Sequence, residues 1–274
     1  MLLIGGFGKG TVKVYVAEMR LLFRYYHQKN VEEINQEDIT NYILFIKRVH
    51  QVGRAKCRSV AHSCSFFFKK VLIKPFVLPS VLYPRKEFIL PNIMTLEEIQ
   101  TLFNCKLDYR TRSVLGLLYG AGMRIGEVRD LLITDIDSKQ NQITIRQGKG
   151  NKDRMTLLPQ SLLTDLRLYF REARPKIHLF ESKQTKRAMH QRSLSLLVSN
   201  AMEKAGFKNK GYTAHTLRHS FATHLLNAGS DIHTIKTLLG QSKIETTMVY
   251  LHLQTSKRQQ IISPLDALNK TSHE

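Results

Sequence analysis

The chain has 274 residues, of which 42% are hydrophobic and 23% charged, a balance typical of a globular protein with one large domain or two ordinary ones. Lysine and arginine number 42 against 22 acidic residues, so the formal net charge is +20. This many like charges repel one another and resist a compact fold, which indicates a polyanionic partner. Nucleic acid is the first candidate, and an anionic membrane surface is the second. No run of about 18 apolar residues is present, which excludes a transmembrane helix. We expect a cytoplasmic protein, because the three cysteines form no CxxC pair and are typical of core packing in a reducing compartment (Cys57, Cys64 and Cys105).

The first third of the chain has the pattern of a small, basic helical domain. Apolar residues recur at helical spacing over 12–26, with basic residues between them. A second helix is expected to begin at Asn35, which stands three residues before Asp38 as in a capping box. A third helix is expected over 54–72. We therefore predict a small, basic helical domain over residues 1–76.

A proline-rich, basic segment follows this domain. Four prolines fall close together among lysines and arginines, which predicts an extended linker over residues 77–93 (Pro75, Pro79, Pro84 and Pro91). Thr95 and Glu98 then form a second capping-box pattern, and a new helical period begins. The sequence thus predicts a second domain over residues 94–274.

The second domain is predicted to be mainly helical with a small β-hairpin, so that the whole chain belongs to the α+β class. A helix over 111–119 is expected to stop at the glycines that follow it, and Arg124 should begin the next helix. Segments 142–146 and 154–158 are expected to form two strands joined by a glycine-containing turn. In the first segment, the apolar Ile143 and Ile145 alternate with polar residues, as in a half-buried strand. The remainder shows helical patterns.

Cutting a DNA strand without a metal requires a nucleophile, cations that hold the phosphate oxygens, and an acid for the leaving oxygen. His215 and Arg218 stand three apart on one face of a predicted helix, near its N-terminus, where partial positive charge favours a phosphate. Arginine suits the clamp because its planar fork donates two parallel bonds. Two alternatives remain, a solvated helix face and a zinc site of His215, His219 and His224, although the latter lacks an HExxH pattern.

Four segments, in this order, resemble the successive active-site boxes of the tyrosine recombinases, the family of phage integrases and of bacterial enzymes that resolve chromosome dimers. They are LLYGAGMRIGEVRDL, GKGNKDR, HTLRHSFATHLL and LLGQSKIETTMVYLHL. The resemblance covers roughly residues 94–253. The helical N-terminal part, residues 1–76, more loosely resembles the core-binding (SAM-like) DNA-binding domain of the same family.

The resemblance implies a role for each matching residue. Arg124 matches the first catalytic arginine of the family, and Glu127 the acidic residue that braces it. His215 and Arg218 match the histidine and the second arginine of the HxxR pair. The family uses neither a metal nor a nucleotide cofactor, because the phosphotyrosine bond conserves the energy of the broken phosphodiester. We therefore expect no cofactor here.

The resemblance also implies an acid and a nucleophile. Lys149, in the hairpin turn, matches the lysine that protonates the 5′-hydroxyl leaving group, and Lys152 is a rival for this role. Lys152 and Arg154 are expected to contact backbone phosphates. Tyr250 matches the nucleophile that becomes joined to the 3′-phosphate of the cut strand. Taken by itself, Tyr250 would be read as a packed aromatic residue.

One position departs from the family pattern. The family usually has histidine, or sometimes tryptophan, where this chain has Gln241. The glutamine amide can donate a hydrogen bond to a phosphate oxygen, but it cannot exchange a proton near neutral pH. We therefore expect Gln241 to keep part of the support of the transition state and to have no acid–base role.

These features predict a site-specific DNA recombinase whose two domains grip duplex DNA from opposite faces. Its partner would be double-stranded DNA with paired half-sites, bound by a homo-tetramer that is a monomer or dimer off DNA. A type IB topoisomerase and a non-catalytic DNA-binding accessory protein are the alternatives, and Gln241 favours the latter. The apolar residues of the tail, 251–274, suit either a cover over the chain's own core or a contact with a neighbouring protomer.

Overall fold

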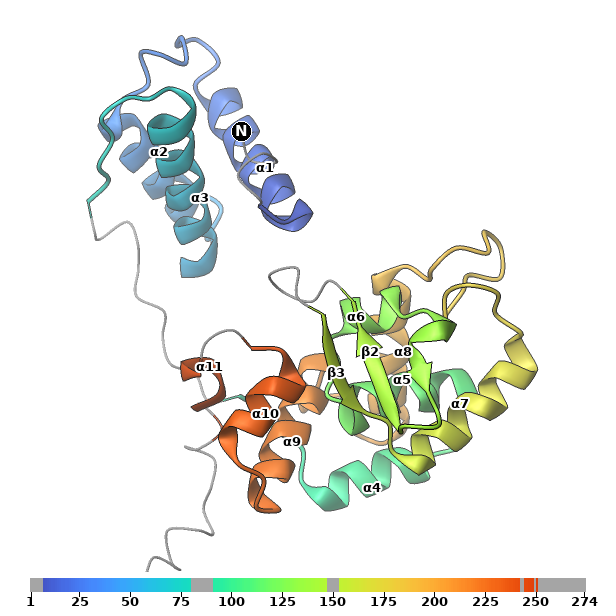
Figure 1. Ribbon diagram of the computed structural model, residues 1–274. Coiled ribbons are helices and arrows are strands. Elements are labelled where there is room, and N and C mark those ends of the chain that lie inside the picture. The colour runs from blue at the N-terminus through green and yellow to red at the C-terminus, as the bar shows by residue number, and fades with distance from the viewer. Residues whose placement is uncertain (1–6, 80–90, 147–152, 242–243, 249, 251–274) are drawn as a thin grey trace, which may run out of the picture. The chain divides into compact units, whose positions relative to one another are not determined.

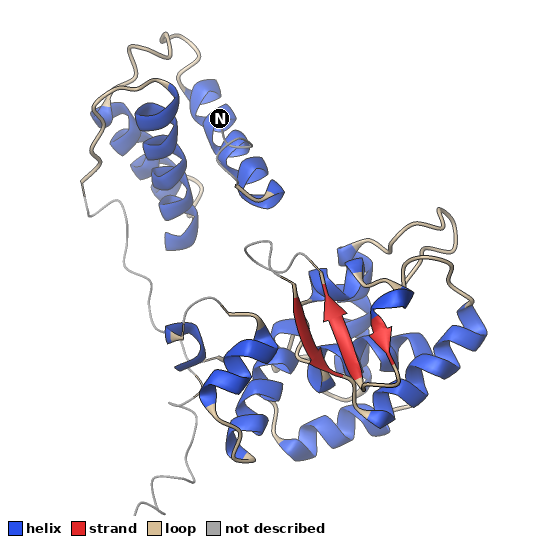
Figure 2. Ribbon diagram, in the orientation of Figure 1, coloured by secondary structure: helices blue, strands red, loops and turns tan. Residues whose placement is uncertain are grey.

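The computed structural model describes residues 7–79, 91–146, 153–241, 244–248 and 250, and the chain divides into two compact units, Met1–Ile89 and Leu90–Glu274 (Figure 1). The units are mainly helical, with one small sheet in the second (Figure 2). This confirms the predicted fold class. No helix among the described residues is long and apolar enough to cross a membrane.

The first unit is a helical bundle built on α3. Helices α1 (Lys9–Tyr25) and α2 (Gln36–Arg48) both pack against α3 (Arg54–Phe66). The predicted capping box at the start of α2 is present, since Asn35 and Asp38 exchange two side-chain-to-backbone hydrogen bonds of 3.0 Å. The core is formed by apolar residues from all three helices, including Leu22, Ile39, Val60, Ala61 and Cys64.

The third predicted helix, 54–72, is confirmed to within a residue of its end, but its last turn has a different helical form. The segment η1 (Phe67–Val71) continues it as a π-helix, in which Leu72 N–H donates to the carbonyl of Phe67. The wider turn accompanies the stacking of Phe68 on Phe76, with ring centroids 4.8 Å apart. Phe76 and Leu78 return to the core of this unit, so this part of the predicted linker packs against the helices. Residues 80–90 of that linker lie outside the described residues.

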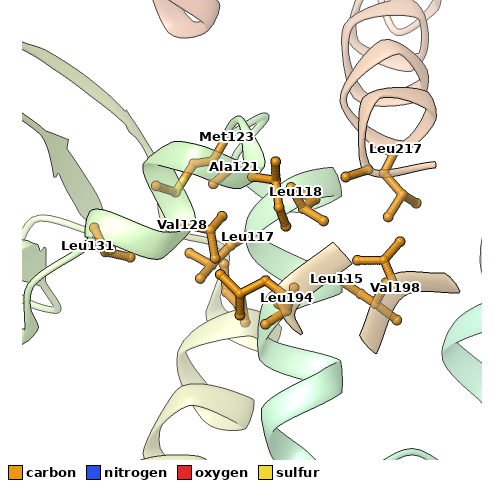
Figure 3. Close-up of a cluster of buried hydrophobic side chains, with 14 of the residues drawn as sticks. Leu115, Leu117, Leu118, Ala121, Met123, Val128, Leu131, Leu194, Val198 and Leu217 are labelled. Carbon is orange, nitrogen blue, oxygen red and sulfur yellow. The ribbon is translucent and has the colours of Figure 1, made fainter. Parts of the chain in front are cut away.

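The second unit is built around α5 (Tyr109–Gly120). This helix is apolar on several sides, and it packs against α6 (Ile125–Asp130), α7 (Gln160–Ala173), α8 (Gln191–Lys204) and α9 (Ala214–Asn227). Gly116 lets α7 approach, because a Cβ there would lie 2.7 Å from Leu162 Cδ1. Figure 3 shows the resulting cluster, to which α5, α6, α8 and α9 contribute buried side chains such as Leu115, Leu117, Leu118, Val128, Leu194, Val198 and Leu217.

Shorter elements complete the unit. They are α4 (Leu96–Asn104), η3 (Ile133–Asp135), α10 (Ile232–Leu239) and α11 (Glu245–Met248). The capping box predicted for Thr95 and Glu98 is present at the start of α4, with hydrogen bonds of 2.9 and 3.2 Å. Both capping predictions are therefore confirmed.

The sheet has three antiparallel strands in the order β1 (Ile136–Asp137), β2 (Gln142–Ile145) and β3 (Arg154–Leu157) (Figure 2). The predicted hairpin is confirmed as β2 and β3, with Ile145 opposite Arg154. Strand β1 was not predicted, because two residues carry no alternation to detect. Helix α10 packs beside β3 and brings the C-terminal part of the unit to the hairpin. The turn at 147–152 lies outside the described residues.

Candidate active site

Three arginines meet at one largely enclosed carboxylate, that of Glu127 in the first turn of α6. Arg124 precedes this helix, and its guanidinium and its backbone N–H each donate to Glu127 at 2.7 Å. Arg154 adds two bonds of 2.8 Å, and Arg218 Nη1 lies 3.7 Å from Glu127 Oε2. Because three guanidinium groups share one carboxylate, this cluster keeps a net positive charge. Such a cluster is suited to holding a phosphate.

The carboxylate of Glu127 is ionised over a wide pH range. Its side chain is 10% exposed, and burial by itself would raise its pKa. The hydrogen bonds and charges of Arg154 and Arg124 outweigh that effect and lower the pKa of Glu127 to about 2. Since the folded-state pKa is below the ordinary value, Glu127 contributes stability at neutral pH that is lost as the pH falls from about 4.5 toward 2.

Glu127→Gln is expected to lower the free energy of unfolding at pH 7 by about 3–5 kcal/mol, because it leaves buried guanidinium groups without their counter-charge. The loss should shrink as the pH falls below about 4.5, since Glu127 of the wild type then takes up a proton in the unfolded chain while it stays ionised in the folded protein. Urea unfolding at pH 7, 4 and 3 checks this, with Glu203→Gln as the control at an exposed carboxylate. Parallel stability–pH curves for wild type and Glu127→Gln would contradict the account.

Arg218 is the most enclosed of the arginines, at 4% exposure. It donates to the carbonyl of Gly122 at 2.5 Å and to that of Leu239, the last residue of α10, at 2.6 Å. The carbonyls at a helix C-terminus lack partners and carry partial negative charge, so a guanidinium stabilises them. Gly122 has φ 61°, and a side chain there would collide with the ring of Phe221. The glycine is thus required where the loop carbonyl meets Arg218.

Arg154 fixes the same end of α10. Its Nε donates to the carbonyl of Leu238 at 3.0 Å, while its other nitrogens bind Glu127. Gly240 follows the helix with φ 59°, and a Cβ there would lie 2.5 Å from Arg154 Cδ. The side chain of Arg154 is 7% exposed. The prediction that Arg154 contacts backbone phosphates is therefore wrong: this residue positions the Glu127 carboxylate and the end of α10.

The two predicted clamp arginines differ in accessibility. Burial lowers the pKa of Arg218 to about 9, with a further contribution from Arg124, so its guanidinium is still charged at neutral pH. Arg124 has 28% of its side chain exposed and is open to a ligand. His215, in the first turn of α9, is exposed, whereas Arg218 on the next turn is buried. These two residues are therefore close along the helix without sharing an exposed face.

Tyr250 lies against this cluster, just after α11. It is 2% exposed and packs with apolar residues of α9 and α10, namely Phe221, Ala222, Leu226, Ile235 and Leu239. Its hydroxyl is 2.8 Å from Nδ1 of His219. Burial raises the pKa of Tyr250, while Arg218, Gln241 and Arg124 act in the opposite direction. The fold therefore brings two arginines, an amide and a tyrosine together from segments far apart in the sequence.

Gln241 is held by contacts on its own loop. Its backbone N–H donates to the carbonyl of Lys236, and its Oε1 accepts a hydrogen bond of 2.6 Å from the Thr247 hydroxyl. Because the oxygen is engaged by Thr247, the NH₂ group is the end of the amide that acts on Tyr250, and as a donor it acts to lower the pKa of the Tyr250 hydroxyl. The side chain is partly exposed. This arrangement fits the neutral donor expected from the sequence.

Three further expectations from the sequence concern a zinc site, the hairpin lysines and the cysteines. His219 and His224 direct Nδ1 to different tyrosines, Tyr250 and Tyr119, and no group of three His, Cys, Asp or Glu that could hold a metal occurs among the described residues. Lys149 and Lys152 lie outside those residues. Cys57 and Cys64 are buried, as core packing predicts, and Cys105 is partly exposed.

Sequence patterns did not predict the positions of two residues, Arg154 beside Glu127 and His219 beside Tyr250. Arg154 lies on the inward face of β3 with Thr156, while the apolar Met155 and Leu157 are exposed. Hydrophobicity alone would have placed Met155 and Leu157 inward, so it gave no indication that Arg154 faces the interior. His219 was considered only as a metal ligand, because its contact with Tyr250 spans 31 residues of sequence.

Comparisons with known proteins agree on one family. The model described as the phage integrase family matches residues 92–257. The protein y4qK of Sinorhizobium fredii, which bears an integrase/recombinase name, is 33% identical over 97% of this chain and 86% of its own length. A tyrosine recombinase of Thermosipho africanus is 28% identical over 91% of each chain. A crystal structure of the XerH site-specific recombinase bound to its difH substrate has a TM-score of 0.71 at 19% identity, covering 91% of this chain and 78% of XerH. The matched family span contains every residue of the cluster described above.

Proposed function

The chain belongs to the phage integrase family, the tyrosine recombinases, and from this premise we propose that it cleaves and rejoins duplex DNA through a 3′-phosphotyrosine intermediate on Tyr250. Membership of this family makes it a DNA recombinase of the integrase type. One observation carries the finer proposal. Tyr250 packs against α9, which bears Arg218, and against α10, which ends at the carbonyl that Arg218 binds. The charges of Arg218 and Arg124 act to lower the pKa of the Tyr250 hydroxyl, which burial raises.

The proposed reaction is a transesterification. The oxygen of Tyr250 forms a bond to phosphorus, and the bond from phosphorus to the 5′ oxygen breaks. The phenol gives its proton to solvent water, which later returns a proton to the acid that protonates the 5′ oxygen. Arg124 and Arg218 stabilise the charge that develops on the non-bridging oxygens. His215 contacts the same phosphate from the first turn of α9, and Lys149 protonates the 5′ oxygen. Because Tyr250 is 2% exposed, DNA binding must uncover its hydroxyl before attack.

The proposed partner is double-stranded DNA with paired half-sites. The net charge of +20 supports it, as does the likeness to XerH, which was solved bound to its DNA substrate. We propose that residues 1–76 and 94–274 grip the duplex from opposite faces and that four copies assemble on paired sites. A type IB topoisomerase would instead relax supercoiled plasmids without a specific site.

Covalent trapping tests the proposed function. Purified protein is mixed with a pool of duplexes that have a random central sequence and a nick a few nucleotides beyond it. Cleavage releases the short 5′-hydroxyl piece, which diffuses away and prevents rejoining. An adduct that survives denaturation is expected, and its recovered sequences define the site. Binding to the pool without any adduct would favour the alternative that Gln241 supports, a non-catalytic accessory protein.

Gln241→Ala is expected to slow single-turnover cleavage of a recovered duplex by about 10²-fold, the usual effect of a lost donor. Gln241→His should stay within a few-fold, because either side chain presents one N–H. Thr247→Val is the matched control for orientation: it removes the hydroxyl that holds Oε1 and should produce a smaller loss. If Gln241→His greatly increases the rate and adds a pH dependence near 6.5, the natural residue impairs the enzyme. No change in Gln241→Ala would show that the side chain does not reach the phosphate.

A further inference from the structure

A histidine outside the family assignment made above touches the reacting atom. His219 follows Arg218 on α9, and its Nδ1 lies 2.8 Å from the hydroxyl oxygen of Tyr250, with the ring centroids 5.6 Å apart. Resting on the proposed role of Tyr250 as nucleophile, we propose that His219 holds that hydroxyl in place for attack, accepting its hydrogen bond at Nδ1. His219 is thus a positioning residue that acts through Tyr250.

The surroundings of Tyr250 determine which partner donates. The other groups that act on its hydroxyl are Arg218, Gln241 and Arg124, and all three lower the pKa of Tyr250, as positive charges and N–H donors do. The amide oxygen of Gln241 is already engaged by Thr247. A phenol has one proton to donate and requires an acceptor for it. The imidazole Nδ1 supplies that acceptor, which fixes the tautomer with the proton on Nε2.

Proton affinity favours a holding role over removal of the proton by His219. Burial lowers the pKa of His219 to about 4, and the nearby charges of His215 and Arg218 add to this. Burial raises the pKa of Tyr250 above 10.0. Complete proton transfer from the phenol to the imidazole is therefore strongly unfavourable, because the pKa of the acceptor is lowered and that of the donor is raised. An effective general base has a pKa close to the working pH, which His219 does not. As a neutral acceptor, however, it is available throughout the physiological range.

Positioning of this kind can have a large effect on rate. A nucleophile that rotates away from its line of attack by about 1 Å loses about 10²-fold. Tyr250 has a short anchor, since it follows the four-residue helix α11. The hydrogen bond to α9 ties its hydroxyl to the helix that carries Arg218. The nucleophile and one clamp arginine are thereby kept in register by the same element.

The same helix provides a matched control. His224 directs its Nδ1 to the hydroxyl of Tyr119 at 2.9 Å, and the ring centroids are 5.8 Å apart. Both pairs join a histidine of α9 to a partly or fully buried tyrosine, and one of the two contains the proposed nucleophile. Removing the His224 bond should therefore reproduce the structural cost of removing the His219 bond without its effect on Tyr250.

The kinetic test compares His219→Asn, His219→Leu and His224→Leu in single-turnover cleavage of a nicked duplex recovered from the random pool. Asparagine places its Oδ1 near the position of Nδ1 and accepts a hydrogen bond, but it cannot take up a proton. We expect about a 10²-fold loss for His219→Leu, recovery to within about tenfold for His219→Asn, and near wild-type cleavage for His224→Leu. The pH–rate profile of His219→Asn should have the shape of the wild-type profile between pH 5.5 and 9.

Two results would overturn the proposal. Equal rates for His219→Leu and wild type would show that the contact does not serve cleavage. A rate for His219→Asn as low as that of His219→Leu, with one limb of the pH profile lost, would make His219 a base in place of a holding group. DNA affinity and the thermal unfolding midpoint of each variant separate these results from misfolding.

An NMR measurement on the intact protein tests the proposal without an activity assay. The ¹⁵N spectrum of the His219 imidazole should show Nε2 protonated and Nδ1 bare, and the Nδ1 resonance should move in Tyr250→Phe. A proton on Nδ1 would exclude the acceptor role. Failure of the proposed function has a different signature, which is the absence of any adduct from the wild-type protein.

Discussion

Tyr250→Phe is expected to abolish the covalent protein–DNA complex and to leave DNA affinity within about twofold of wild type. The change removes a single oxygen from a side chain that packs in a closed apolar setting, so the phenyl ring should keep its place. Affinity should persist because it depends on many phosphate contacts in which this oxygen has no part. Denaturing gels measure the adduct, and a filter-binding titration of the same duplex measures affinity.

Tyr119→Phe is the matched control for this substitution. It deletes a hydroxyl that binds a histidine of the same helix at nearly the same distance, 2.9 Å against 2.8 Å. This variant should cleave like wild type. A denaturation-resistant adduct formed by Tyr250→Phe would remove Tyr250 as the nucleophile, whereas loss of the adduct in both variants would point to general damage of α9.

DNA affinity should fall by roughly 10³–10⁵ between 50 and 200 mM salt, if about 6–10 phosphates are neutralised by lysine and arginine. The excess of 42 basic over 22 acidic residues supplies enough cations for that number of contacts. Their release of counterions makes the logarithm of the binding constant fall linearly with the logarithm of salt concentration. Equilibrium titrations at several salt concentrations give the slope.

A nearly flat salt response would contradict this explanation of the charge. An anionic membrane surface, the second partner that composition allows, would then again be a candidate. Sedimentation with vesicles containing an anionic lipid would be the next experiment. A steep slope for a random duplex and for a recovered duplex alike, with an offset between them, would separate the general phosphate contacts from reading of the site.

Local signals in the sequence predicted the elements well. The capping boxes at Asn35 and Thr95 depend on residues three positions apart, and the structure contains both. The hairpin was visible because β2 alternates apolar and polar residues around a turn. The third helix extends almost as far as predicted, but its last turn, Phe67–Val71, is a π-helix, a form that no local pattern in the sequence indicated.

Contacts between distant segments explain what sequence patterns could not give. The motif LLGQS served only to align Gln241 with the family pattern, and nothing in it indicates that Arg154 and Arg218 bind the carbonyls of Leu238 and Leu239. Likewise Glu127 was expected to brace one arginine, and the fold places three around it. Such sharing depends on tertiary approach, because the partners lie on α6, β3 and α9.

The most direct test of the proposed chemistry identifies the atom that becomes bonded to DNA. The trapped adduct is digested with nuclease and trypsin, and the modified peptide is sequenced by mass spectrometry. The tryptic peptide 244–257 contains Tyr250 as its one tyrosine. The account predicts that this peptide carries a nucleotide joined through its 3′-phosphate to Tyr250. A nucleotide on a different residue, or a linkage through a 5′-phosphate, would contradict it.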